Sequence, residues 1–130
     1  MKKSHGFTLI ELMIVLVILG LLASLVAPEM FSKVSSTKRK TAAAQMQMFQ
    51  TALDTFRLDV GTYPTELKEL VGSQRRGWDG PYLPKKIPAD PWGFVYQYRL
   101  NQNGLGFEIM SHGGDGQAGG EGENADVIHE

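Results

Sequence analysis

The chain begins with a long apolar segment. From Phe7 to Ala27, the only strongly polar side chain is that of Glu11. About 20 consecutive apolar residues in a helix span the hydrocarbon core of a bilayer. Lys2 and Lys3 precede the segment, and such a short basic flank normally stays in the cytoplasm. The pattern predicts a transmembrane helix over residues 7–27.

A cleaved secretory signal peptide fits this segment less well. Its apolar core would be about 7–15 residues long and would end at a small-x-small site. Here the run is longer, and the best candidate site, Ala27, is followed by Pro28. Charge does not settle the orientation, because the leader lysines are outnumbered beyond the segment by Lys33, Lys38, Arg39 and Lys40. We interpret that basic cluster as a solvated helix face or as intersubunit ion pairs, with anionic lipid headgroups as the weaker alternative.

A second apolar pattern predicts that the helix resumes and reaches residue 60. Apolar residues recur there in steps of 4, 3, 4, 3 and 4, at Ala42, Met46, Phe49, Leu53, Phe56 and Val60. This spacing places them on one stripe of a helix that another part of the chain covers. Pro28 and Gly20 predict a kink or local loosening. We therefore divide the helix into a membrane half, residues 7–27, and an amphipathic half, residues 28–60.

Residues 61–130 are predicted to form a small domain. "TYPTELKELVG" predicts a short helix capped by Thr65 and ended by Gly72. "FVYQYRL" and "FEIMS" alternate on either side of "NQNG", which predicts a β-hairpin packed on the helical stripe. Eight glycines fall within residues 104–122, and we predict no regular element in the tail that follows this hairpin. The fold class is α+β, a long N-terminal helix on a small antiparallel sheet.

Composition excludes several kinds of function. The 13 Lys and Arg residues nearly balance the 14 Asp and Glu residues, so no nucleic-acid partner is expected. There is no cysteine for a disulfide, a thiol nucleophile or a cysteine-based metal cluster. Ser111, His112 and Asp115 are too close along the chain to assume a catalytic triad. These observations predict a structural subunit and not an enzyme.

Glu11 has two interpretations. A charge at the centre of a membrane helix costs about 3 kcal/mol, but near the end of the segment the carboxylate reaches headgroup level at little cost. Alternatively, cleavage between Gly6 and Phe7 would make Glu11 the fifth residue of a chain with a free α-amino group. That amine would offer the carboxylate a cation at the same membrane depth.

The N-terminal stretch "KKSHGFTLIELMIVLVILGLLASLVAP" resembles the class III signal of type IV pilins and pseudopilins. The resemblance implies that residues 1–6 are a cytoplasmic leader, which a prepilin peptidase removes after Gly6 before it methylates the amine of Phe7. It also implies that Glu11 pairs with the N-terminal amine of a neighbouring subunit. Such a pair would favour one axial stagger of packed helices, because an unpaired carboxylate is expensive there.

Three later stretches resemble the major pseudopilins of bacterial type II secretion systems, in order and spacing: "FRLDVGTYPTEL", "GPYLPKKIPADPWGFVYQY" and "SHGGDGQAGGEGENADV". The resemblance implies a single-pass protein of the inner membrane whose C-terminal domain is periplasmic. Copies of it would polymerise into a pseudopilus that drives export of folded proteins across the outer membrane. The implied partners are further copies, minor pseudopilins, the prepilin peptidase, the inner-membrane assembly platform, and membrane lipid before assembly.

The acidic, glycine-rich loop over residues 113–126 is a candidate cation site. Its carboxylates belong to Asp115, Glu121, Glu123 and Asp126, and hard cations such as Ca²⁺ take six to eight oxygens. Chemistry alone favours a solvated acidic tail. The resemblance instead implies one structural Ca²⁺ held by Asp115 and Asp126, with backbone carbonyls near His112 and Gln117 and with Glu121 or Glu123 as substitutes. The sequence departs from the family where it reads "DVIHE", so the ligand number stays open.

Two alternative functions remain open from the sequence. One is a subunit of a surface fibre of the type IV pilus kind, although the acidic loop favours the secretion system. The other is a monomeric, membrane-anchored calcium-binding module. The module would tolerate replacement of Glu11, whereas either filament requires its charge.

Overall fold

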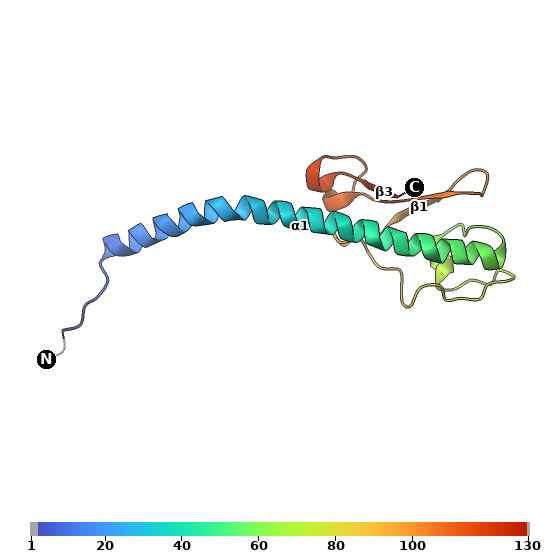
Figure 1. Ribbon diagram of the computed structural model, residues 1–130, viewed down its shortest axis with the longest axis horizontal. Coiled ribbons are helices and arrows are strands. Elements are labelled where there is room, and N and C mark those ends of the chain that lie inside the picture. The colour runs from blue at the N-terminus through green and yellow to red at the C-terminus, as the bar shows by residue number, and fades with distance from the viewer. Residues whose placement is uncertain (1–2, 130) are drawn as a thin grey trace. The chain divides into compact units, whose positions relative to one another are not determined.

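The computed structural model describes residues 3–129 and has the predicted α+β architecture (Figure 1). Residues 1 and 2 of the predicted leader, and residue 130, lie outside the described residues. The chain divides into two compact units, of which the first ends at Ser36 and the second begins at Thr37. The elements in chain order are α1 (Leu9–Val60), η1 (Leu67–Leu70), β1 (Gln97–Leu100), β2 (Phe107–Ser111), η2 (Gly113–Asp115), η3 (Gly122–Asn124) and β3 (Val127–His129), where η denotes a 3₁₀ helix.

The first unit consists of the N-terminal part of α1 and the residues before it. The helix begins at Leu9, two residues later than predicted, and it continues through Gly20 and Pro28 without interruption. By length and composition, this part of α1 could cross a membrane. Every large apolar side chain from Leu9 to Val34 is at least 49% exposed. Within the described residues, this unit has no core of its own.

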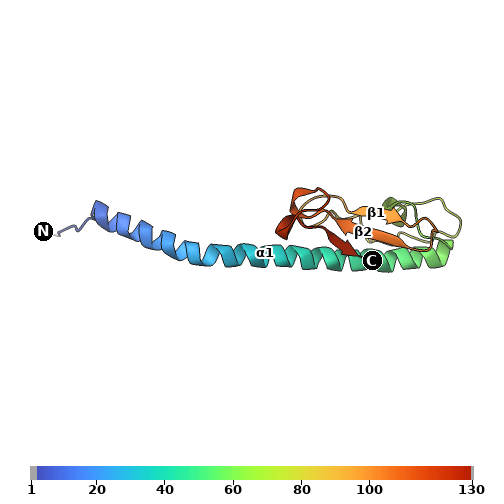
Figure 2. The same ribbon diagram turned by 90° about the horizontal axis from the view of Figure 1, so that it is seen from above.

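The second unit has a core built on the predicted helical stripe. The residues of α1 that are buried are Ala42, Met46, Phe49, Ala52, Leu53 and Phe56, which confirms the spacing argument. All of them except Ala42 belong to a cluster with η1, the loops and the sheet, which lies along the C-terminal part of α1 (Figure 2). The ring of Phe49 meets that of Tyr96 edge-on at 5.2 Å, and Ile109 of β2 is fully buried. This core fixes the sheet to the helix.

The sheet has three antiparallel strands in the order β1-β2-β3. Leu100 pairs with Phe107, so the predicted hairpin is confirmed. Its first strand is shorter than predicted, because Phe94 forms a backbone turn with Asp90 before the strand begins. The prediction that the glycine-rich tail has no regular element was wrong. Residues of β3 pair with β2, with Val127 opposite Ser111, so this short segment is a strand because a neighbouring strand supplies its partners.

The predicted short helix is a single 3₁₀ turn, and Thr65 is not its cap. The N-cap position is Glu66, whose side chain makes no capping hydrogen bond within the described part of the chain. Thr65 instead donates its backbone N–H, at 2.9 Å, and its hydroxyl, at 2.7 Å, to the carboxylate of Glu69. The side chain that was expected to cap the helix therefore forms a hydrogen bond with Glu69 instead.

Glu69 organises the loop that follows α1. Besides Thr65, its carboxylate accepts a charge-assisted contact from Arg75 Nε at 2.7 Å. Burial alone would raise the pKa of this carboxyl, but the hydrogen bonds from Thr65 and the charge of Arg75 outweigh burial and hold the pKa below its ordinary value. A carboxylate with a lowered pKa stabilises the fold above its unfolded-state pKa, and this stabilisation is lost as the pH falls through the folded-state pKa.

Replacement of Glu69 by Gln should lower the free energy of unfolding by about 2 kcal/mol at neutral pH, because it removes the charge that binds Thr65 and Arg75. Thermal unfolding of the detergent-solubilised full chain, followed by circular dichroism across a pH series, measures this difference. The deficit relative to wild type should shrink in acid, where the wild-type carboxylate is itself protonated. Glu66→Gln is the control, since Glu66 makes an exposed pair with Lys68, which contributes little to stability. Equal deficits for the two variants, or one for Glu69→Gln that persists in acid, would contradict this account.

Candidate functional site

Two regions carry the predicted functional residues, and the first is the start of α1. The backbone N–H of Glu11 donates to Thr8 Oγ1 at 3.2 Å, and the N–H of Thr8 donates to Glu11 Oε2 at 3.4 Å. This reciprocal pair is a capping box, which satisfies two of the amide groups that a helix start leaves without partners. Sequence reasoning missed it, although its signature, T-x-x-E immediately before an apolar run, is present at Thr8–Glu11. In a single chain, the Glu11 carboxylate therefore has a neutral partner.

The surroundings of Glu11 are apolar. Its side chain lines a shallow hollow on the helix surface together with Phe7, Leu12, Ile14 and Val15. Gly6 and Phe7 lie in irregular backbone before α1, and Phe7 is 92% exposed. A Cβ at Gly6 would meet no heavy atom of the described residues within 4 Å. Packing within this chain thus does not explain why a glycine precedes Phe7.

The second region is the C-terminal loop, which we define as residues 112–126. Its glycines allow the backbone to close on itself. At Gly120, φ is +93°, and a Cβ would lie 2.6 Å from the carbonyl oxygen of Asn124. At Gly113, φ is +72°, and a Cβ would lie 2.7 Å from the carbonyl oxygen of Ala125. Both the dihedral angle and the close approach require glycine.

The acidic side chains of the C-terminal loop have different partners. Asp126 accepts from the N–H of Gly119 at 3.0 Å and lies 3.3 Å from His112 Nδ1. The hydrogen bond from Gly119 and the imidazole of His112 outweigh partial burial and lower the pKa of Asp126. Asp115 accepts from the N–H of Gln117 within its own turn, at 3.0 Å. The structure therefore brings Asp126 to His112 and gives Asp115 a different hydrogen-bond partner.

Glu123 is held by groups outside the C-terminal loop. It accepts from Trp92 Nε1 at 3.2 Å and lies 3.8 Å from Lys38 Nζ. Glu121 is exposed. Among residues 3–129, no three His, Cys, Asp or Glu side chains are grouped so that they could hold a metal ion. The predicted site rests on two aspartates and backbone carbonyls, so the calcium ligands stay a prediction.

Ser111, which the sequence places close to His112 and Asp115, is a core residue. Ser111 is fully buried, and its hydroxyl donates to Asp90 Oδ2 at 2.6 Å. The other oxygen of Asp90 accepts from the backbone N–H groups of Trp92 and Phe94. Ser111 therefore ties the 90–94 turn to the start of the C-terminal loop, while His112 contacts Asp126.

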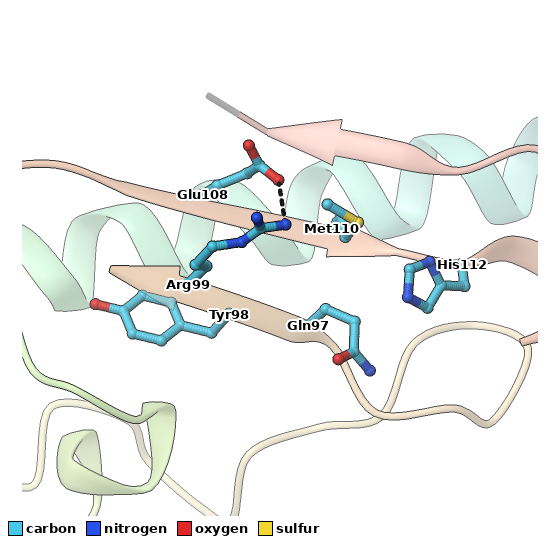
Figure 3. A pocket seen from close by; sticks show the side chains of 6 residues that line it. All are labelled: Gln97, Tyr98, Arg99, Glu108, Met110 and His112. Carbon is cyan, nitrogen blue, oxygen red and sulfur yellow. Dashed lines mark ion pairs between the residues drawn. The ribbon is translucent and has the colours of Figure 1, made fainter. Parts of the chain in front are cut away.

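A shallow pocket on the sheet joins the C-terminal loop at His112 (Figure 3). Figure 3 shows Arg99 of β1 reaching Glu108 of β2, an ion pair of 3.6 Å. The Arg99 side chain is 75% exposed, so this pair contributes little to stability. The other lining residues are Gln97, Tyr98 and Met110.

The basic cluster is not a uniform solvated face. Arg39 donates to backbone carbonyls of the C-terminal loop, so the interpretation as a solvated or intersubunit surface was wrong for this residue. Lys38 is partly exposed and lies near Glu123. Lys33 and Lys40 are exposed. Sequence reasoning could not find the Arg39 contact, because it joins residues 86 positions apart.

Comparison with known proteins agrees with this architecture. Residues 1–27 match the family model described as the prokaryotic N-terminal methylation motif. An apolar N-terminal helix with this motif, followed by a small α+β domain, defines a pilin-like subunit. Residues 29–130 match the model described as type II secretion system protein G, and the chain belongs to that family.

Individual relatives give the same result. The chain is 37% identical over 134 residues to type II secretion system core protein G of Pseudomonas aeruginosa, with 97% of this chain and 94% of that protein covered. It is 38% identical over 135 residues to the protein of that name from Vibrio cholerae, with 98% and 92% covered. The crystal structure of the major pseudopilin from the type 2 secretion system of enterohaemorrhagic Escherichia coli matches with a TM-score of 0.62 at 26% identity. That match covers 75% of this chain and 86% of the other.

Replacement of Gly120 by Ala should open the C-terminal loop more than replacement of Gly119 by Ala. Both glycines have positive φ, so both substitutions introduce backbone strain of about 1 kcal/mol. Only the Cβ at residue 120 would collide with Asn124, because a Cβ at residue 119 meets no described heavy atom within 4 Å. Amide hydrogen exchange of residues 119–127 in the full chain should therefore accelerate roughly tenfold more in Gly120→Ala. Indistinguishable exchange in the two variants would show that the close approach to Asn124 does not hold the loop.

Proposed function

We propose that this chain is a membrane-anchored structural subunit that polymerises into the periplasmic pseudopilus of a type II secretion system and drives export of folded proteins across the outer membrane. The observation that carries the proposal is the apolar surface of α1 from Leu9 to Val34, which the described residues leave exposed. Family membership and the relatives named core protein G support the secretion system over a surface fibre.

Burial requirements explain why the subunit needs two environments. A contiguous apolar surface of this size is incompatible with water, so it is covered first by lipid and then by helices of other copies. Transfer from lipid to a helix bundle gains little hydrophobic free energy, because lipid tails are as apolar as leucine. Packing and polar contacts must therefore decide how the copies align. In residues 9–27 of α1, Glu11 is the one ionisable side chain available for that purpose.

Glu11 specifies the alignment by exchanging one partner for another. In the single chain, its carboxylate accepts from the neutral N–H of Thr8 at 3.4 Å, a long and weak hydrogen bond. The α-amino group of a neighbouring Phe7, created by cleavage after Gly6 and methylated, is a cation and a stronger donor. The room around Gly6 supports a requirement for glycine in the prepilin peptidase and not in this fold.

The remaining parts of the proposal follow from membrane orientation. Residues 1–6 are cytoplasmic until they are removed, and residues 28–130 are periplasmic. The inner-membrane assembly platform receives the processed chain, and minor pseudopilins join the same filament. A monomeric calcium-binding module would leave the apolar surface in lipid and would give Glu11 no role beyond its capping box.

Replacement of Glu11 by Gln tests the exchange of partners. Gln also occurs at this position of capping boxes, so the variant retains the acceptor for Thr8 while it loses the charge. We expect assembly, measured by crosslinking between copies in membranes, to fall about tenfold or more, because the amide cannot form an ion pair with the Phe7 amine. Membrane insertion should be unchanged.

Glu29→Gln is the matched control, since it removes an exposed carboxylate of the same unit outside the apolar segment. The intact mass of each variant verifies that residues 1–6 are lost and one methyl group is gained, so that failed processing is not mistaken for failed assembly. Normal crosslinking of Glu11→Gln would sink the proposed ion pair and leave only the capping box.

We also propose that the C-terminal loop binds one Ca²⁺ through Asp115 and Asp126 with backbone carbonyls, Glu121 or Glu123 substituting for a ligand. The acidic, glycine-rich composition of the loop supports this proposal. As folded, Asp115 and Asp126 accept hydrogen bonds from different backbone N–H groups, so each carboxylate would share or exchange that partner to bind Ca²⁺.

Addition of Ca²⁺ to the metal-free full chain should raise its melting temperature by several degrees, because a ligand that binds only the folded state stabilises it. Asp115→Asn should abolish the increase, whereas Asp79→Asn, which removes an exposed carboxylate outside the loop, should retain it. Identical melting of the wild type with excess Ca²⁺ and with excess EGTA would dispose of the calcium site.

A further inference from the structure

Arg39 reaches from α1 into the C-terminal loop and binds backbone oxygens there. Its Nη1 donates to the carbonyl oxygen of Ala125 at 2.9 Å and, more weakly, to that of Gly122 at 3.5 Å. Its Nη2 donates to the carbonyl oxygen of Asp126 at 3.3 Å. All three carbonyls come from one short stretch, so a single guanidinium spans the turn that leads into β3.

These carbonyls lie at the 3₁₀ turn η3 and just beyond it, and that of Gly122 also accepts from the backbone N–H of Ala125 at 3.3 Å. Gly122 begins the 3₁₀ turn η3, and Ala125 follows its end. The last carbonyls of a helical turn have no partners within the turn, and Arg or Lys side chains can satisfy them. A planar guanidinium with five N–H donors suits several acceptors at once better than an ammonium does. Arg39 is half-buried, so its hydrogen bonds are partly shielded from water.

Lys38 adds a second cation from the same turn of α1. Its Nζ lies 3.8 Å from Glu123, the carboxylate that Trp92 also contacts. Together, Lys38 and Arg39 place two positive charges of the helix against the segment in which Glu121, Glu123 and Asp126 concentrate negative charge. The complementarity is local, because Lys40, the next residue, is exposed.

We propose that Arg39 is a built-in cation of the C-terminal loop, which binds the carbonyls of Gly122, Ala125 and Asp126 and keeps the loop and β3 folded without a divalent ion. The position of β3 depends on these contacts, because Val127 follows Asp126 directly and pairs with Ser111. The site is a property of the subunit itself and is separate from the assembly role of Glu11.

Hydrogen exchange of the full chain in detergent, with excess EGTA present throughout, tests the proposal. Arg39→Met removes the donors and retains most of the aliphatic stem. We expect exchange of the amides of residues 122–129 to accelerate about tenfold or more, because the carbonyls lose a charged donor. Arg39→Lys keeps the charge but replaces the planar guanidinium with a single ammonium group. Amide exchange in this variant should therefore lie between that of the wild type and that of Arg39→Met.

Lys40→Met is the control, since it removes an exposed charge from the neighbouring position without touching the loop. Protection of Leu53, in the buried part of α1, should be the same in all four proteins and verifies that each is folded. Two results would overturn the proposal. One is wild-type exchange in Arg39→Met; the other is a wild-type loop that is already unprotected in EGTA, which would mean that only a divalent ion can order it.

Discussion

The apolar surface of α1 between Leu9 and Val34 constrains everything else in this chain, because it cannot be left in water and the chain offers little to cover it. The same helix is buried farther along, where Met46, Phe49 and Leu53 pack under the sheet. One continuous helix of 52 residues thus has an exposed apolar part and a buried part. The buried part forms the core of a small domain, and the exposed part needs lipid or further copies of the chain to cover it.

Polar groups decide the geometry within each part. At the start of α1, hydrophobic burial does not favour one axial alignment of packed helices over another. We propose that the charge of Glu11, which can exchange Thr8 for a neighbouring amine, sets that alignment. In the second unit, glycine is too abundant after β2 for apolar burial to hold the C-terminal loop. Close backbone packing at Gly113 and Gly120 and the guanidinium of Arg39 hold it instead.

The parts of the fold that sequence predicted are those with local periodicity. The 4-3-4-3-4 spacing identified the buried stripe, and alternation around "NQNG" identified the hairpin of β1 and β2. The failures have nonlocal causes. Thr65 was expected to cap a helix but binds Glu69, and β3 is a strand only because β2 lies beside it. The Arg39 contacts join distant segments, so no spacing rule could reveal them.

The candidate sites divide in the same way. The capping box has a local signature, T-x-x-E, which is present in the sequence next to the processing motif although it was missed. The position of Glu11 relative to Gly6 is also local. The acidic loop could be recognised from the sequence only by its composition. Composition does not show whether the carboxylates converge on one point or bind separate partners, as they do here with Gly119, Gln117 and Trp92. A pattern of charges predicts a site reliably only when the backbone between them is regular.

The most direct test of the account is a structure of the assembled filament in which side chains are resolved at the helix core. The account predicts that the carboxylate of Glu11 lies within hydrogen-bond distance of the methylated amine of Phe7 in an adjacent copy, with its contact to Thr8 lengthened or lost. A Glu11 carboxylate that still accepts only from its own Thr8, with no amine of another copy near it, would contradict the account.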